Sequence, residues 1–309
     1  MISGAAILGA YFLDQLFGDP HFRLHPVCLI GAVAEFWRKR LYALGKLGGL
    51  LTLLGTVFVF ELLVLGASRL GPFMEVVILY FYLAEKALRE EALKVYQALV
   101  RKDLFQARRV LSFIVGRETK GLSSAQCVRA TIETVAENFT DAVVGPLFYY
   151  VVGGLPLATF YKVVETLDSM YGYKTKKWRE FGFFIARADD LLNFLPARGA
   201  MFFLVLAALF LGMPFRRAFY TAVREARKHD SPNAGWPEAA VAGALGIQLG
   251  GQVIYQGEVF QKGTLGQALR SLEPLDIKRA VALLRVATCG VVLFFCLVEV
   301  FLWKLGYLH

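Results

Sequence analysis

Three carboxylates recur at intervals of four residues in the stretch 130–146: Glu133, Glu137 and Asp141. On an α-helix of about 3.6 residues per turn, each step of four drifts by only about 40°, so the three side chains form one stripe with Asn138 beside it. No Lys or Arg lies between Arg129 and Lys162 to neutralise this stripe. Carboxylates at this spacing repel one another, and Mg2+ carried with a phosphate ligand would relieve the repulsion. The stripe therefore predicts a magnesium site, with an acidic helix face in solvent as the alternative.

A second charged cluster follows the next apolar stretch, and its members crowd two short segments: Asp168, Lys174, Arg187, Asp189, Asp190, Asn193 and Arg198. Asp190 and Asn193 lie three residues apart and share a helix face. The pattern Asp-Asp-x-x-Asn beside an apolar segment is typical of a second metal or phosphate position. A salt-bridged helix start is the alternative interpretation.

Two further loops carry polar groups that suit phosphate or proton chemistry. Arg117 and Thr119 stand in G-R-E-T-K-G-L-S, directly before the acidic stripe, where cationic and hydroxyl groups suit phosphate contact. The loop H-D-S-P-N-A-G-W-P-E contributes four polar side chains: His229, Asp230, Asn233 and Glu238. Near the N-terminus, Asp14, Asp19, His21 and His25 lie within twelve residues and predict a polar site.

The composition indicates which elements must position these groups. Hydrophobic residues make up 57% of the 309 residues, charged residues make up 19%, and the formal net charge is +9. An apolar chain with excess Lys and Arg is typical of an integral membrane protein whose basic loops face the cytoplasm. The basic residues are spread over several loops, which disfavours nucleic-acid binding. The four cysteines have no zinc-binding or disulfide spacing.

Apolar runs predict an all-α, polytopic membrane protein with a single domain, residues 1–309, and about four to six membrane-embedded helices. The runs are residues 1–17, 47–70, 73–84, 142–161, 195–213 and 280–303. Gly145-Pro146 and Gly153-Gly154 interrupt the fourth run, which predicts a broken or re-entrant helix lining a cavity. We expect residues 85–115 to continue the third run as an amphipathic helix, and residues 252–276 to form a loop. Amphipathic helices would then form a site-bearing cytoplasmic face.

Four blocks in this order resemble one family. They are L-D-Q-L-F-G-D-P…H-P-V…I-G (13–31), A-T-I-E-T-V-A-E-N-F-T-D-A-V-V-G-P-L-F (130–148), T-L-D-S-M-Y-G-Y-K with A-R-A-D-D-L-L-N-F-L-P-A-R (166–198), and H-D-S-P-N-A-G-W-P-E-A-A-V-A-G-A-L (229–245). The blocks look like adenosylcobinamide-phosphate synthase, the membrane-bound amide-forming enzyme of cobalamin biosynthesis. Glu165 stands where Asn is expected, and Glu118 stands where Asp is more usual.

The resemblance implies the reaction and its participants. A carboxylate of the corrinoid adenosylcobyric acid is joined to the amine of an aminoalcohol phosphate such as aminopropanol phosphate, with ATP and Mg2+ required. The implied partners are these substrates, a nucleotide, the lipid bilayer and other late cobalamin-assembly membrane enzymes. The implied location is the cell membrane, with several membrane crossings and the active site facing the cytoplasm.

Combining the residue patterns with this chemistry gives a hypothesis for each side chain. The metal-binding candidates are Glu133, Glu137, Asp141, Asp168, Asp189 and Asp190. The phosphate- and cofactor-binding candidates are Arg117, Thr119, Asn138, Lys174, Arg187, Asn193, Arg198 and Asn233. The catalytic candidates are His25, Glu137, His229 and Asp230, with either histidine as the base that takes the ammonium proton.

Two other functions remain as alternatives. An intramembrane prenyl- or alcohol-phosphate transferase also uses Mg2+ between acidic helices, and it would work without ATP. A transporter would fit the broken helix and the charged interior, but it predicts inverted repeats, which the sequence does not contain.

Overall fold

The computed structural model describes residues 3–20, 22–255 and 258–305, so the predicted contribution of His21 lies outside the described residues. Its contacts divide the chain into two compact units. Unit 1 comprises Met1–Ala84, Asp141–Asn193 and Val292–His309, and unit 2 comprises Glu85–Thr140 and Phe194–Val291. Each predicted site residue therefore belongs to one of two separately packed bodies.

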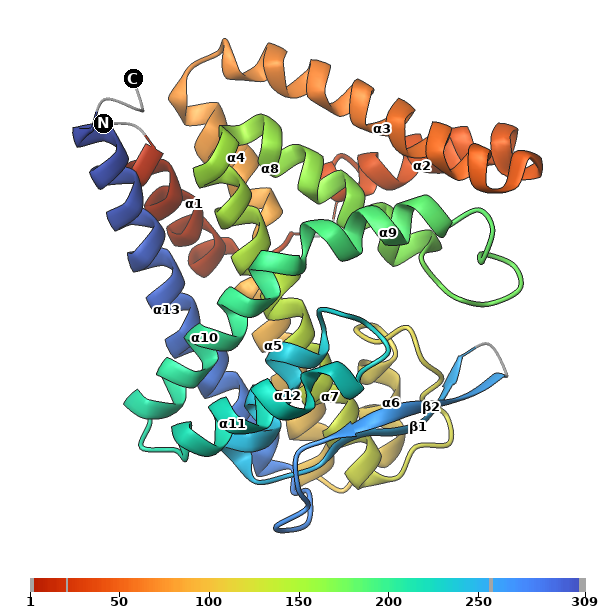
Figure 1. Ribbon diagram of the computed structural model, residues 1–309, viewed down its shortest axis with the longest axis vertical. Helices are drawn as coiled ribbons and strands as arrows, with labels where there is room; N and C mark the ends of the chain where they lie inside the picture. The colour runs from red at the N-terminus through yellow and green to blue at the C-terminus, as the bar shows by residue number, and fades with distance from the viewer. Residues whose placement is uncertain (1–2, 21, 256–257, 306–309) are drawn as a thin grey trace. The chain divides into compact units, whose positions relative to one another are not determined.

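Unit 1 is helical. It contains α1 (Ser3–Phe17), α2 (Pro26–Leu41), η1 (Tyr42–Leu44), α3 (Gly45–Ser68), α4 (Pro72–Tyr82), α8 (Gly145–Tyr171), α9 (Phe183–Leu192) and the end of α13 (Leu275–Lys304) (Figure 1). Helices α2, α3, α8 and α9 pack around buried apolar side chains that include Val163, Leu167 and Phe181. A Cβ atom at Gly49 would lie 1.7 Å from the carbonyl oxygen of Phe181, so α3 approaches this segment as only glycine permits.

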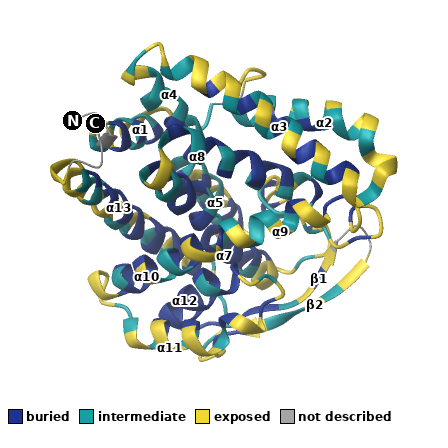
Figure 2. Cartoon of the chain, turned by 45° about the horizontal axis from the view of Figure 1, so that its top comes forward, coloured by how far each residue is buried: buried dark blue, intermediate teal, exposed yellow. Residues whose placement is uncertain are grey.

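Unit 2 contains a small hairpin beside its helices. The elements are α5 (Glu85–Val100), α6 (Leu104–Leu111), α7 (Ser124–Phe139), α10 (Phe194–Phe210), α11 (Phe215–Glu225), η3 (Ala226–Lys228), α12 (Gly235–Leu245), β1 (Leu249–Tyr255), β2 (Glu258–Leu265) and the first part of α13. Helix α12 is buried along its length (Figure 2) and packs against α7, α10 and α11. Its small residues make this possible, since a Cβ atom at Gly243 would lie 2.7 Å from the carbonyl oxygen of Arg217.

The predicted all-α membrane architecture is confirmed. Within the described residues, three helical segments are long and apolar enough to cross a membrane: Pro26–Ser68, Ser124–Tyr171 and Leu275–Lys304. Phe183–Leu192 and Phe194–Phe210 form a bent pair that would make a fourth span. Helix α3 has exposed positions along its length (Figure 2), and its large apolar side chains Leu54, Phe58 and Leu62 are among the exposed ones, as expected of a surface that lipid covers.

The predicted break in α8 is also confirmed. Gly153 and Gly154 adopt non-helical backbone angles, and Gly154 has a φ of +66°, which only glycine adopts readily. Gly145 and Pro146, by contrast, begin the helix. A Cβ atom at Gly145 would lie 2.2 Å from the Tyr161 hydroxyl, so this glycine lets the phenol reach its position.

Two element predictions are wrong. Residues 252–276, expected as a loop, contain most of the antiparallel β1–β2 hairpin, in which Val253 pairs with Phe260. Residues 73–115 do not form a continuous helix, because Leu83 is extended and separates α4 from α5. Lys102, with a φ of +59°, and Asp103, which caps α6, then separate α5 from α6.

Candidate functional site

Glu133 is the most deeply buried member of the predicted acidic stripe. A capping box of Ser123 and Gln126 begins α7, and the helix carries Glu133 into the core of unit 2. One carboxylate oxygen, Oε2, lies 2.6 Å from Nη2 of Arg117, and the other accepts a hydrogen bond of 2.7 Å from the Gly250 N–H group. The expectation that nothing local neutralises the stripe is therefore wrong at Glu133, because Arg117 from the preceding loop forms an ion pair with it.

Asp141 departs from the helical register of Glu133 and Glu137. The chain forms a π-helical turn over Thr140–Val144, and a π turn adds a residue to the helical repeat. Glu133 and Glu137 belong to unit 2, whereas Asp141 belongs to unit 1, where its Oδ1 atom lies 3.4 Å from the Tyr161 hydroxyl. The prediction of three carboxylates in one α-helical stripe thus holds only for Glu133 and Glu137.

The loop before α12 fixes the His229 ring next to a buried carboxyl group. The Nδ1 atom accepts a hydrogen bond of 3.0 Å from the Ser231 N–H group, so a neutral imidazole carries its proton on Nε2. That Nε2 atom lies 3.6 Å from Oε1 of Glu238, which is fully buried. The Ser231 hydroxyl oxygen accepts from the N–H groups of Asn233 and Ala234, which holds the loop at the start of α12.

The surroundings of this pair set its protonation. Burial raises the pKa of Glu238 well above its ordinary value, and the nearby carboxylates of Glu133 and Glu137 raise it further, against the opposing charges of Lys262 and Arg117. Burial also lowers the pKa of His229, as does Lys262, while Glu137 opposes that shift. The pair therefore favours a neutral imidazole and a protonated carboxyl group. Among the described residues, neither carboxyl oxygen of Glu238 has a hydrogen-bond partner.

Arg198 and Asn233, both predicted to bind phosphate, meet in unit 2. The Arg198 Nη1 atom donates a hydrogen bond of 3.3 Å to Oδ1 of Asn233, and the guanidinium group lies 4.8 Å from the centre of the Trp236 ring. It also lies 3.6 Å from the ring centre of Phe194. These contacts orient a cationic group that is suited to an anionic ligand.

The remaining candidates of unit 2 differ in exposure. Thr119 is buried, Glu137 and Asn138 are half-buried, and Asp230 is exposed. Glu137 and Asp230 are thus carboxylates of this set that a substrate can reach.

Unit 1 gathers the second charged cluster around Asn193. The Asn193 Nδ2 atom donates to both carboxylate oxygens of Asp189, at 3.1 and 3.2 Å, and its Oδ1 atom accepts from the Tyr161 hydroxyl at 2.9 Å. Tyr149 stacks on Tyr161 with ring centres 5.1 Å apart. Asp189 also interacts electrostatically with Asp168. The structure therefore brings Asp168, Asp189 and Asn193 together.

The cations of unit 1 lie at the edge of this cluster. Arg187 is exposed, and its Nη1 atom lies 3.8 Å from Oδ2 of Asp190, so the salt-bridged alternative describes this pair. Lys174 is also exposed and interacts electrostatically with Asp190.

His25 lies in unit 1, so the two catalytic histidine candidates belong to different units. Its Nδ1 atom accepts from the Val27 N–H group at 3.3 Å, which caps α2, and its Nε2 atom lies 2.7 Å from Oδ1 of Asp19. Both ring nitrogens of His25 therefore contact polar groups within 3.3 Å.

No group of three or more His, Cys, Asp or Glu side chains is arranged to hold a metal ion in the part of the chain that the structure describes. Mg2+ is nevertheless commonly held by one or two carboxylates together with phosphate oxygens. Asp189 beside Asp168, and the half-buried Glu137, offer carboxylates of that kind.

The residue patterns in the sequence assign no role to Glu238 or Lys262. Glu238 ends the H-D-S-P-N-A-G-W-P-E loop and is followed by a run of small apolar residues. That position was the available indication that the carboxyl group is buried. Lys262 lies on β2, in the segment that was expected to be a loop.

Comparison with known proteins assigns the family. Residues 7–284 match the model described as CobD/Cbib protein. The chain belongs to the CobD/Cbib family. A cobalamin biosynthesis protein CobD of Geobacter metallireducens is 45% identical over 302 residues, which cover 94% of this chain and 95% of that protein. The CobD protein of Clostridium perfringens is 41% identical over 88% of this chain and 90% of its own. The CobD protein of Photorhabdus laumondii is 39% identical over 96% of this chain and 98% of its own.

No solved structure matches this chain. Membership of the CobD/Cbib family confirms the predicted resemblance and supports a role in cobalamin biosynthesis.

Proposed function

We propose that the protein is an adenosylcobinamide-phosphate synthase that joins a carboxylate of adenosylcobyric acid to the amine of an aminoalcohol phosphate. Membership of the CobD/Cbib family supports this proposal over a prenyl-phosphate transferase and over a transporter. The observation that carries it within the structure is the unit 2 cluster, in which Glu137, the His229–Glu238 pair and the cations Arg117 and Lys262 interact. Amide formation from a phosphorylated amine requires both proton transfer and anion binding.

The proposed reaction has two steps. A carboxylate oxygen of the corrinoid attacks the terminal phosphorus of ATP, and ADP leaves with the electron pair of the broken P–O bond. The amine nitrogen then attacks the acyl carbon of this acyl phosphate, a base takes the ammonium proton, and phosphate leaves as the C–N bond forms. A carboxylate is a poor acyl donor, which is why the first step is needed.

In this proposal Glu137 holds the ammonium group and accepts its proton. A half-buried carboxylate is accessible to substrate, whereas the two nitrogens of His229 face Ser231 and Glu238. His229 then acts by holding a proton on Nε2 toward Glu238. Burial keeps Glu238 protonated, so that no second negative charge lies beside Glu137.

Arg198 and Asn233 bind a phosphate group in this proposal. Stacking against Trp236 and Phe194 holds the Arg198 guanidinium group in one orientation, which favours bidentate contact with phosphate oxygens. Lys174 and Arg187 are the exposed cations of unit 1 that would serve a second phosphate group.

The clustered carboxylates of unit 1 fit Mg2+ bound with phosphate. Asp168, Asp189 and Asp190 would hold it, and the like charges around Asp189 provide a reason for a cation there. When bound, Mg2+ neutralises the charge of the phosphate oxygens. We propose the cell membrane as the location, with the site facing the cytoplasm where ATP is available, and other late cobalamin-assembly enzymes as neighbours.

One assay tests this function. Purified protein is incubated with adenosylcobyric acid, aminopropanol phosphate and Mg2+, with and without ATP, and the amide is detected by mass spectrometry. We expect adenosylcobinamide phosphate and stoichiometric ADP only when ATP is present. Equal amide yield without nucleotide would overturn the activation step, and transfer to a prenyl phosphate without ATP would favour the transferase alternative.

A further inference from the structure

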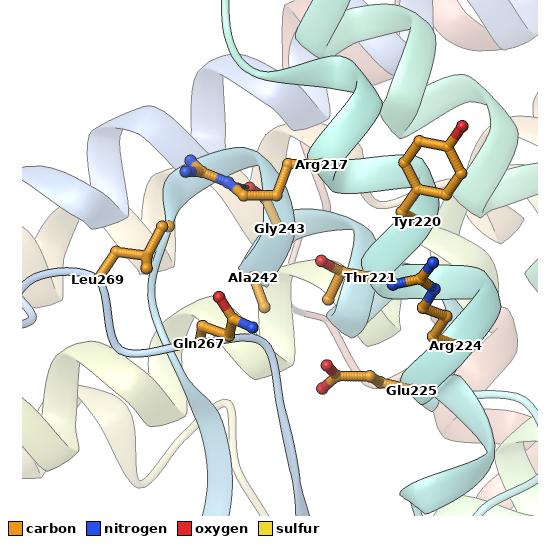
Figure 3. Close-up of a pocket in the computed structure, with 10 residues that line it drawn as sticks. Arg217, Tyr220, Thr221, Arg224, Glu225, Ala242, Gly243, Gln267 and Leu269 are labelled. Carbon is orange, nitrogen blue, oxygen red and sulfur yellow. Dashed lines mark hydrogen bonds between the residues drawn. The ribbon is translucent and has the colours of Figure 1, made fainter.

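A cavity lies between α11, α12 and the loop after β2, and none of its lining residues is assigned to the reaction. Its volume is about 160 Å3. Helix α11 contributes Arg217, Tyr220, Thr221 and Arg224 on one side, and the loop contributes Gln267 and Leu269 on the other (Figure 3). Pockets for drug-sized ligands usually occupy about 300–1,000 Å3, so this cavity suits a small group rather than a nucleotide or a corrin ring.

The cavity presents cationic donors. The Arg217 Nε atom donates to the carbonyl oxygen of Gly243 at 2.6 Å, which fixes the guanidinium group at the wall. Arg224 lies at 5.7 Å from the Tyr220 ring centre. Among the described residues, neither arginine forms an ion pair. Glu225 also lines the cavity, but its carboxylate lies 3.3 Å from Nζ of Lys228 and accepts a hydrogen bond of 2.9 Å from the Gly266 N–H group, so its charge is compensated.

The helix that carries these arginines is built for a membrane surface. It follows α10, the second half of the bent candidate span, after a short turn. Ala218 and Ala222 bury one face against the protein, while Phe219 and Val223 remain exposed on the adjacent face. Residues 216–228 contain five Lys or Arg and one acid. An amphipathic, basic helix with exposed apolar residues lies in the membrane interface and attracts anionic lipid.

We propose that this cavity binds the phosphate headgroup of an anionic membrane lipid. Arg217 and Arg224 contact the phosphate, Thr221 and Gln267 contact the polar part of the headgroup, and Phe219 and Val223 lie along the acyl chains. The proposal is independent of the amide-forming reaction, because none of these residues has a role in it.

The experiment uses the full-length protein in a zwitterionic detergent and titrates dioctanoyl phosphatidylglycerol while thermal unfolding is measured. We expect the anionic lipid to raise the unfolding temperature of the wild type more than dioctanoyl phosphatidylcholine does. Arg224→Gln should weaken the apparent affinity about fivefold, and Arg217→Gln/Arg224→Gln about 25-fold, because a basic residue near an anionic membrane surface contributes roughly 1 kcal/mol. Arg109→Gln, which removes an exposed arginine of α6, is the matched control and should leave the affinity unchanged.

Two outcomes would overturn the proposal. The first is an Arg224→Gln variant that binds phosphatidylglycerol as tightly as the wild type, a result that stands even if Arg217→Gln impairs folding. The second is equal protection by glycerol 3-phosphate or inorganic phosphate, which would make the cavity a site for a soluble anion.

Discussion

The Nε2 atom of His229 lies 3.6 Å from Oε1 of Glu238, and the two side chains are buried together in unit 2. The Ser231 N–H group holds the opposite nitrogen of the ring, so the proton of the neutral imidazole is directed at the carboxyl group. A buried carboxyl group without a hydrogen-bond partner is costly, and such groups concentrate at functional sites. This relationship connects the loop before α12 to the proposed chemistry.

Glu238→Gln tests whether the pair supports catalysis. We expect kcat and KM to stay close to the wild-type values, because glutamine has the size and the neutral charge of the protonated carboxyl group. The substitution preserves shape, so far-ultraviolet circular dichroism should be unchanged. Glu273→Gln, at an exposed acid of the same unit, is the control and should keep wild-type kcat. A large loss of kcat in Glu238→Gln alone would show that the Glu238 carboxyl group itself exchanges a proton during turnover.

Glu137→Gln tests the proposed base. We expect amide formation to be abolished while the protein stays folded, since glutamine keeps the size of the side chain and loses its proton affinity. Steady-state rates and thermal unfolding of the same preparation give the answer. A variant that turns over at the wild-type rate would remove Glu137 from the active site.

Arg117 and Glu133 should contribute to the stability of the folded protein as a coupled pair. Arg117→Gln leaves a buried, uncompensated carboxylate, and breaking a buried pair in this way costs about 3–5 kcal/mol. Adding Glu133→Gln removes that charge, so the double variant should recover part of the lost unfolding temperature. Thermal unfolding of the single and double variants measures the coupling. Additive losses would show that the two charges do not depend on each other.

The shifted pKa values of His229 and Glu238 should each make the free energy of unfolding depend on pH. Burial lowers the pKa of His229, so below about pH 6.5 the unfolded chain binds more protons than the folded chain. The free energy of unfolding therefore decreases as the pH is lowered. Burial raises the pKa of Glu238, so above about pH 4.5 the folded state binds more protons and stability falls as pH rises. The two effects oppose each other in the wild type.

Separating them requires two variants. In Glu238→Gln, the unfolding temperature should fall as pH is lowered below about 6.5, because only the His229 effect remains. Adding His229→Gln should reduce that fall. If the two variants show the same pH profile, His229 does not titrate with a lowered pKa.

The sequence was informative where local patterns decide the structure. Apolar runs identified the helices, and Gly153-Gly154 identified the break in α8. The β1–β2 hairpin was missed because β1 contains Gly250 and Gly251 and β2 contains Gly263, and glycine is depleted in strands. The π-helical turn before α8 moved Asp141 out of register, and no spacing rule indicates such a turn.

Tertiary pairing decided the rest of the site. Arg117 and Glu133 are sixteen residues apart in sequence, and Gly250 completes the carboxylate's partners from the hairpin. The charged residue types in this part of the sequence predicted a charged site. Which cation faces which acid, however, depends on how the loop that carries Arg117 folds back on α7. The complete burial of Glu238 likewise follows from packing around α12 rather than from its neighbours in sequence.

The Tyr161 hydroxyl should act on metal binding through Asn193. It donates to the Asn193 Oδ1 atom, and Asn193 in turn donates to both oxygens of Asp189, so the phenol fixes the direction in which this carboxylate faces. Groups that orient a metal ligand typically change metal affinity about 10- to 100-fold when removed. We therefore expect Tyr161→Phe to raise the Mg2+ concentration for half-maximal amide synthesis roughly tenfold, with kcat at saturating Mg2+ nearly unchanged.

Tyr82→Phe is the matched control, because the Tyr82 hydroxyl is buried in the same unit and contacts Thr159 at 2.9 Å, away from the acidic cluster. It should lower stability to a similar extent without changing the Mg2+ dependence. An equal Mg2+ requirement in wild type and Tyr161→Phe would mean that Asp189 binds no metal or needs no orientation by Asn193. A fall in kcat at saturating Mg2+ would instead assign Tyr161 a direct part in the reaction, since restoring the metal would then fail to restore the rate.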